Sequence, residues 1–450
     1  SSDLWNPIRG LGDAYSKNVW DVLYDPGIFK NPYSGQSFPV REHWTVETAG
    51  PNGKIDVPSD AIFWNVSEQK WDSAQGKKAT SKVTYDLLWS NWHNGEKMDM
   101  NDILYSIYFA QEWGSTQTEN DKTFDPEYTP TANPSAKTLI AVKPINDHTI
   151  EVYLNYWHFD DSEIADWGSV WVSMPWEIMA SMESAVIDGK ASFSRTDSQS
   201  KSIDWFSLIM PRDAKLISDY LKKFSRTGYI PPALEKFVMS NDYAKSRYES
   251  TITWIDKKNH AVISNGPFYL DSYSPEVRTI TIRSFDDNSY PFNSGYWKKF
   301  ESVKLPQIID IDIPTKIIPG EKTLIQFKTQ NSTMLYYFVS DSSGIEIAHG
   351  IIPIKSDVGE ILLDSNTTKI MHNGGHDIKV YAVSDTVLKP DIYMTSFYVS
   401  DKPNDADDVE IISSSQNRIQ NNYGIIVSLI GTIIVGIIVY FRKSHRLSKH

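Results

Sequence analysis

The side chains of this sequence offer few arrangements that could carry out catalysis. The chain has no cysteine, which excludes thiol nucleophiles, disulfides and zinc–thiolate sites. It contains no GxSxG, HExxH, P-loop or GxGxxG motif, and its histidines are scattered without the spacing typical of metal ligands. We therefore expect a binding protein rather than an enzyme, with no catalytic residue, no metal and no cofactor.

Two acidic groups are the remaining places where chemistry could occur. Asp160–Glu163 contains paired carboxylates of the kind that serve a glycosidase, so a surface hydrolase stays open as an alternative. On a chain with a net charge of −13, however, an acidic cluster is more often a solvated face. Asp286–Asn288 resembles the start of a calcium loop but lacks the DxDxDG spacing and the distal glutamate. We expect a turn there.

Composition narrows the class of partner. The negative net charge argues against nucleic acid and against anionic lipid headgroups as partners. Aromatic residues make up 13% of the chain, with 15 Trp and 24 Tyr, which suits a surface that stacks on ligands. Dense aromatic packing inside the fold is an equally good reading of the same excess. Both readings remain open at this stage.

Residues 1–313 read as a body of mixed helices and strands. Apolar residues at 3–4 spacing predict three helices, with Asn101 as the N-cap of the first and Gly228 just past the end of the second. These helices are expected at Met100–Trp113, Lys215–Arg226 and Asn241–Lys257. Strands are expected at Lys82–Trp89, His148–Leu154, Gly266–Tyr273 and Thr279–Arg283. Mixed elements over this length indicate an α/β or α+β body with more than one lobe.

Residues 314–402 show only strand signals, separated by turns of Gly, Asn and Ser. The spacing predicts an all-β, immunoglobulin-like sandwich of about seven strands. The strands are expected at Thr323–Lys328, Met334–Ser340, Ile345–Pro353, Gly359–Leu363, Asp377–Val383 and Tyr393–Val399.

The C-terminal part of the chain predicts a membrane anchor. Tyr423 to Phe441 carries no charge and is long enough, at about 1.5 Å per residue, to cross the roughly 30 Å of a bilayer core. Residues 442–450 are basic, which places them in the cytoplasm and the bulk of the chain outside the cell membrane, as a single-pass protein. Residues 403–422 form a polar stalk or linker. Residues 1–20 lack the pattern of an export signal, so either a signal was removed or the chain belongs to a longer precursor.

Three sequons accompany this outward topology. They begin at Asn65, Asn331 and Asn366, and they fit a glycoprotein exposed at the cell surface.

Four blocks in the first region resemble the extracellular solute-binding proteins of peptide-type ABC importers, called family 5. The blocks are Asn6–Glu47 with its YDP turn, Asn91–Ala110 (NWHNGEKMDMNDILYSIYFA), Ala141–Asn155 (AVKPINDHTIEVYLN) and Ile263–Trp297 (SNGPFYL to GYW). Their order and spacing are similar to those of the family. With the C-terminal anchor, the chain looks most like archaeal, surface-anchored members.

The resemblance implies a bilobal, periplasmic-binding-protein-like body that closes on a peptide or similar polar solute and delivers it to ABC permease subunits for transmembrane transport. The ligand-binding residues it implies are Tyr24, Asp25, Trp113, Asn265 and Gly266. The sequence departs from the family after Trp297, where the β-sandwich begins within about twenty residues. Part of one lobe is therefore missing from the expected pattern. The alternative is a structural cell-envelope or adhesion protein that uses a degenerate binding fold.

Overall fold

The chain folds into two compact units. The structure, a computed structural model, describes residues 5–115, 121–238, 240–277 and 279–401. The first unit comprises residues up to 30 together with 36–294, and the second comprises 31–35 and the residues from 295 onward. The boundary lies near residue 294 instead of 313, because strand β13 (Gln307–Asp312) pairs with β15 (Thr323–Gln330) of the sandwich. This division separates the first region from the sandwich, and the expected division of the first region into two lobes stays a prediction.

The first unit contains an antiparallel sheet in the order β3-β8-β10-β9-β5-β6. Its strands are β3 (Glu42–Thr48), β5 (Ile62–Asn65), β6 (Lys70–Ser73), β8 (Ser81–Leu87), β9 (Leu139–Pro144) and β10 (Thr149–Leu154). In β8, Val83, Tyr85 and Leu87 face the core, as the two-residue period of a strand requires. Because neighbouring strands run antiparallel, this unit is α+β and not a doubly wound parallel fold.

Three two-stranded sheets add to the first unit. They pair β1 (Ile28–Lys30) with β2 (Ser37–Pro39), β4 (Ile55–Asp56) with β7 (Lys78–Ala79), and β11 (Phe268–Ser274) with β12 (Thr279–Ser284).

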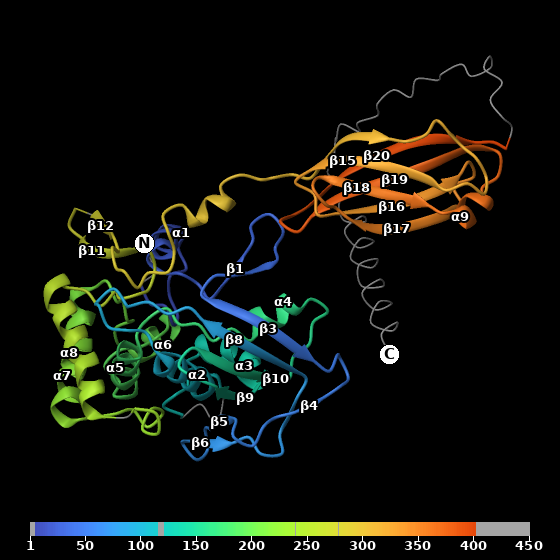
Figure 1. Cartoon of the computed structure of the whole chain (residues 1–450). Coiled ribbons are helices and arrows are strands. Elements are labelled where there is room, and N and C mark those ends of the chain that lie inside the picture. The colour runs from blue at the N-terminus through green and yellow to red at the C-terminus, as the bar shows by residue number, and fades with distance from the viewer. Residues whose placement is uncertain (1–4, 116–120, 239, 278, 402–450) are drawn as a thin grey trace. The chain divides into compact units, whose positions relative to one another are not determined.

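Helices pack with the sheet around one main core that is rich in aromatic residues (Figure 1). They are α1 (Ala14–Leu23), α2 (Met100–Gly114), α3 (Tyr128–Thr138), α4 (Asp161–Trp167), α5 (Trp176–Ile187), α6 (Arg195–Lys201), α7 (Pro211–Thr227) and α8 (Asn241–Lys258). The three predicted helices are confirmed as α2, α7 and α8. The aromatic excess therefore goes largely into packing within this unit.

The predicted N-cap of α2 is wrong by two residues. Asp99 caps the helix: its Oδ1 accepts a hydrogen bond from the Asn101 backbone N–H at 2.9 Å. Asp102 completes a capping box by accepting from the Asp99 N–H at 3.1 Å. Gly228 ends α7 in the left-handed conformation, as predicted.

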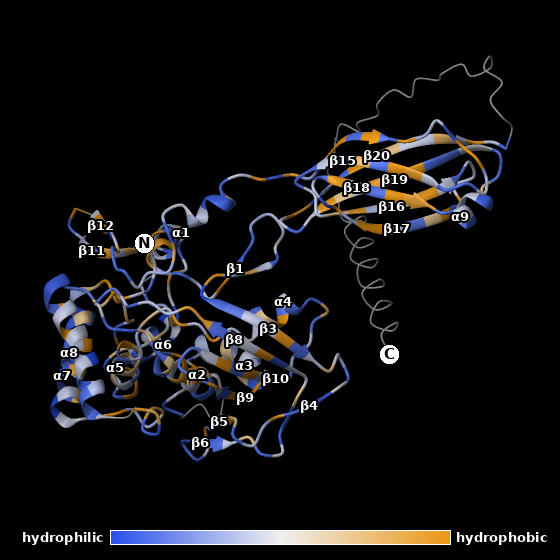
Figure 2. Cartoon of the chain, viewed as in Figure 1, coloured by the Kyte–Doolittle hydropathy of each residue, from blue (hydrophilic) through white to orange (hydrophobic). Residues whose placement is uncertain are grey.

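The second unit is a β-sandwich. A sheet in the order β13-β15-β18 faces a sheet in the order β14-β20-β19-β16-β17, and both contribute to one core. The remaining strands are β14 (Lys316–Ile317), β16 (Met334–Asp341), β17 (Glu346–Pro353), β18 (Val358–Leu363), β19 (Gly374–Ser384) and β20 (Val387–Val399); this unit also holds the short helices η1 (Tyr296–Phe300) and α9 (Ser365–Lys369). Hydrophobic and hydrophilic residues alternate along these strands (Figure 2). All six predicted strands of this region are present.

The predicted anchor cannot be compared with the structure. Tyr423–Phe441, the stalk at 403–422 and the basic tail at 442–450 lie outside the described residues. None of the described helices combines the length and the apolar character that a membrane crossing needs.

Candidate functional site

Four of the five predicted ligand residues lie together around a buried arginine. The guanidinium of Arg41 pairs with Asp25, with both Nε and Nη2 close to Oδ2 at 3.1 and 3.0 Å. Nη2 also donates to the carbonyl oxygen of Asn265 at 2.7 Å. We call Tyr24, Asp25, Arg41, Asn265 and Gly266 the Arg41 cluster. Arg41 itself was not among the predicted ligand residues, although it lies in the first of the four family-like blocks.

Burial governs the electrostatics of this cluster. Burial raises the pKa of Asp25 above its ordinary value, and the charge of Arg41 offsets this only in part. Arg41 is fully buried, and the rings of Tyr290 and Phe292 each lie 5.2 Å from its guanidinium carbon. Removing either partner of such a pair leaves an uncompensated buried charge, so the pair holds the surrounding segments in place.

Gly266 brings two distant segments into contact. Its N–H donates to the Leu23 carbonyl at 2.8 Å. A Cβ at this position would lie 2.5 Å from the Leu23 carbonyl carbon and 2.6 Å from the Tyr24 nitrogen. The glycine was expected to let backbone approach a ligand. What approaches it is the protein's own backbone at the end of α1.

His93 links the second family-like block to the same place. Its Nδ1 accepts from the Ser264 N–H at 3.2 Å, and its Nε2 donates to the Gly266 carbonyl at 3.1 Å. Burial lowers the pKa of His93 to about 3, so the ring is neutral and its tautomer is set by these two bonds. Asn91 adds a second link, because its backbone N–H donates to Ser289 Oγ at 2.7 Å.

Three of the four blocks therefore meet in one place, although they are separated by up to about 240 residues. The polar groups that meet there are buried and bonded to one another: Asp25 is 1% exposed, and Asn265 is 0% exposed. Tyr24 is half-buried, and burial raises the pKa of its hydroxyl above the ordinary value. In this structure the residues of the Arg41 cluster bond to one another and hold distant segments of the chain together. Their expected contact with a ligand stays a prediction.

Trp113 lies apart from the Arg41 cluster. It is fully buried, and its Nε1 donates to Glu183 Oε1 at 2.7 Å. The hydroxyls of Tyr105 and Tyr108 donate to the same carboxylate. Burial raises the pKa of Glu183 despite these three donors. Trp113 therefore has the core role, and it cannot stack on a ligand without rearrangement of the core.

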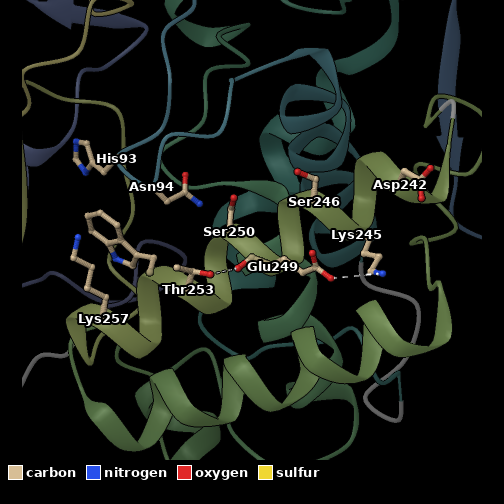
Figure 3. A pocket seen from close by; sticks show the side chains of 10 residues that line it. His93, Asn94, Asp242, Lys245, Ser246, Glu249, Ser250, Thr253 and Lys257 are labelled. Atoms are coloured by element: carbon tan, nitrogen blue, oxygen red, sulfur yellow. Dashed lines mark hydrogen bonds and ion pairs between the residues drawn. The ribbon is translucent and has the colours of Figure 1, made fainter.

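A hollow open to solvent lies next to the Arg41 cluster. His93, which bonds to Gly266 of that cluster, is one of its lining residues. The volume of the hollow is about 650 Å³, within the range of roughly 300 to 1,000 Å³ common for ligand sites. Most of its lining comes from one face of α8, where residues three and four apart are neighbours (Figure 3). The lining residues are His93, Asn94, Asp242, Lys245, Ser246, Glu249, Ser250, Thr253, Trp254 and Lys257. These residues were not among the predicted site residues, although their spacing along α8 places polar side chains on one face of the predicted helix.

Two buried carboxylates in the first unit were also missed. Burial raises the pKa of Glu42 to about 7, although Ser169 Oγ and the Val170 N–H donate to it at 2.5 and 3.0 Å. Burial likewise raises the pKa of Glu177 to about 7, even beside Arg247 at 2.8 Å. Their sequence neighbours gave no sign of burial, because a single acidic residue reads as surface.

The acidic groups considered for chemistry have structural partners. Asp160 accepts from the Ser162 N–H at 3.0 Å and so caps α4. Glu163 pairs with Lys30 at 2.5 Å. Asp287 accepts from the Ser289 N–H at 2.8 Å, which makes the calcium-like run a turn, as expected. Among the described residues, no group of three or more His, Asp or Glu side chains could hold a metal ion.

The three sequons differ in exposure. Asn331 and Asn366 are exposed in the second unit, whereas Asn65 is half-buried and its Nδ2 donates to Asp72 Oδ2 at 2.7 Å. Asn331 Nδ2 also donates a hydrogen bond, to the Leu305 carbonyl at 3.2 Å, so the three sites differ in exposure and Asn65 is the least accessible to a glycan. Glycosylation stays a prediction.

Comparisons with known proteins do not show a family for this chain. No protein-family profile matches it, and no curated protein does. Among solved structures, the periplasmic binding protein AgaA from A. tumefaciens R10, in complex with agropinic acid, matches with a TM-score of 0.24 and 12% identity. The match covers 72% of this chain and 45% of AgaA, so the chain spans less than half of that protein's length. A TM-score this low carries no argument about fold or ligand.

Proposed function

We propose that this chain is a solute-binding subunit of an ABC importer, held on the outer face of the cell membrane by the segment Tyr423–Phe441. It captures a peptide or similar polar organic solute and presents it to permease subunits. The observation that supports this proposal best is the meeting of three family-like blocks at the Arg41 cluster, beside a polar hollow. Closure of two lobes on the solute, which the family resemblance implies, is part of the proposal.

Thermal unfolding of the full chain with pools of polar solutes tests the proposal. A solute present at 100 times its dissociation constant adds about 2.7 kcal/mol to the free energy of unfolding. We therefore expect one pool of peptides, organic acids or sugars to raise the melting temperature by several degrees. Deleting the gene should then abolish uptake of that solute. A cooperatively folded sample that no pool stabilises would contradict solute binding.

A second candidate function is that of a structural cell-envelope or adhesion protein that uses a degenerate binding fold. The burial of Asp25, Asn265 and Trp113 favours it, since these residues bond to the protein and leave no open cleft among themselves. Such a protein should be abundant in isolated envelopes and should show no change in melting temperature with any solute pool.

A further inference from the structure

Two charged side chains at opposite ends of the hollow have no bonding partner among the residues that the structure describes. Asp242 lies in the first turn of α8 and Lys257 in its last turn, and both are exposed. Neither side chain makes a hydrogen bond or ion pair with any described residue. Figure 3 shows them at the two ends of the row of side chains that lines the hollow. The hollow is therefore dipolar, with a negative and a positive end.

Between these two ends, the charged side chains on α8 that line the hollow are paired with each other. Lys245 pairs with Glu249 at 3.7 Å, so their charges compensate each other. Ser246 and Ser250 donate to Glu96, at 3.4 and 2.5 Å. A ligand lying here meets hydroxyl groups, a compensated ion pair and the nearby carboxylate of Glu96, a hydrogen-bonding surface that suits a polar chain without negative charges in its middle.

Trp254 is an independent sign of a missing partner near the positive end. It lines the hollow three residues before Lys257, on the same side of the helix, and is 9% exposed. Its buried Nε1–H has no hydrogen-bond partner among the described residues. A buried donor without an acceptor is rare in folded proteins, because it loses its bond to water without gaining another. A small shift of the indole toward a bound acceptor would satisfy it.

The length of α8 sets the size of a ligand that reaches both charges. Asp242 and Lys257 are fifteen positions apart, which corresponds to about 22 Å along a helix that rises 1.5 Å per residue. An extended peptide spans about 3.3–3.6 Å per residue, so about six residues cover this distance.

We propose that the hollow along α8 binds linear zwitterions, with the ligand's ammonium group at Asp242 and its carboxylate at Lys257 and Trp254. Short peptides of about six residues with free ends are the simplest members of this class. The proposal rests on the proposed function, because it assigns that function's ligand to one surface and one direction. It predicts selectivity for length and for free ends, neither of which follows from solute binding in general.

Calorimetric titration of the full chain with synthetic peptides tests this assignment. The probes are an uncharged-side-chain hexapeptide with free ends, the same peptide with an acetylated N-terminus, the same peptide with an amidated C-terminus, and a tripeptide. We expect the free hexapeptide to bind most tightly. Lys257→Gln should weaken it by roughly fivefold, the upper range for an exposed ion pair, and should not weaken the amidated form. Asp242→Asn should likewise weaken binding of the free hexapeptide by roughly fivefold and should not weaken binding of the peptide with the acetylated N-terminus.

Lys222→Gln and Asp256→Asn are matched controls. These two residues form an ion pair at 3.9 Å and do not line the hollow, so their loss should leave peptide affinity unchanged. Because Asp242 and Lys257 also complement the helix dipole, thermal unfolding of each variant separates loss of helix stability from loss of binding.

Two results would overturn the assignment, and they differ in what else they overturn. If the peptides bind with affinities that ignore blocked ends and both variants, the hollow is not the site, while solute binding survives. If neither the peptides nor any solute pool binds to the folded chain, the proposed function fails as well.

Discussion

At the scale of single residues, Gly266 is where the absence of a side chain matters most. Replacing it with alanine places a Cβ against the backbone of Leu23 and Tyr24, which cannot move aside as a flexible side chain can. We expect Gly266→Ala to lower the free energy of unfolding by roughly 1–3 kcal/mol, as overpacking does. Denaturant unfolding measures this. Gly375→Ala is the control, because a Cβ there meets nothing within 4 Å. Equal effects of the two changes would contradict the close approach.

Glu42 makes a second residue-scale prediction, about pH. Its pKa in the folded protein is about 7, above the ordinary 4.5, so the folded state holds the proton more tightly than the unfolded state. The stabilisation is therefore complete below about pH 4 and is lost as the pH rises through 7, with a magnitude on the order of 3 kcal/mol. Glu42→Gln cannot ionise and should not show this loss.

The comparison of wild type with Glu42→Gln isolates this group from Glu177, whose pKa burial raises in the same direction. Urea unfolding between pH 4 and 8 should show the wild type losing stability relative to the variant as pH rises. A difference that stays constant with pH would mean that Glu42 titrates near its ordinary value.

At the scale of elements, the periodicity of apolar residues predicted the type of each element more accurately than the residues at which it begins and ends. The three predicted helices are all present, because apolar residues at 3–4 spacing must share one face to be buried together. The cap of α2 was placed at Asn101 and lies at Asp99. Both residues are good caps, and the choice depends on Asp102, which reaches back to the Asp99 N–H only in the folded geometry.

The same helix can serve core and surface at once, as α8 does. Its inner side buries Arg247 between Asp102 and Glu177, while its outer side lines the hollow. Burying an Arg with two acids costs desolvation, which the mutual attraction of the charges offsets, so loss of one partner would leave an uncompensated buried charge. From the sequence pattern alone, both sides of such a helix are predicted to be polar, because the buried Arg247 looks like a surface residue.

At the scale of the whole molecule, each unit has its own main hydrophobic core. We therefore expect a substitution in one core to change the unfolding transition of that unit alone. Phe327 is fully buried in the sandwich core, and Phe193 is fully buried in the core of the first unit. We expect Phe327→Ala to destabilise the sandwich by about 3–5 kcal/mol and to leave the first unit's unfolding transition in place. Differential scanning calorimetry should show one transition moving, and Phe193→Ala should move the other. A joint shift of both transitions would contradict two independent units.

The unit boundary was the main error of domain organisation. The alternating residues of β13 read equally well as the end of the first region or the start of the second. Only its pairing with β15 decides between them. The number of lobes in the first region is likewise not given by the number of its elements, because it depends on which elements share a core.

The sequence by itself determined the types of the predicted elements, the all-β character of residues 314–401, and four of the residues that gather at the Arg41 cluster. These follow from local rules, namely periodicity, turn chemistry and the absence of catalytic motifs. Only the tertiary structure decided that Asp25, Asn265 and Gly266 gather around Arg41, that Trp113 serves the core, and that α8 carries an open dipolar surface. Burial and pairing of these groups arise between segments up to about 240 residues apart, and no local pattern specifies such contacts.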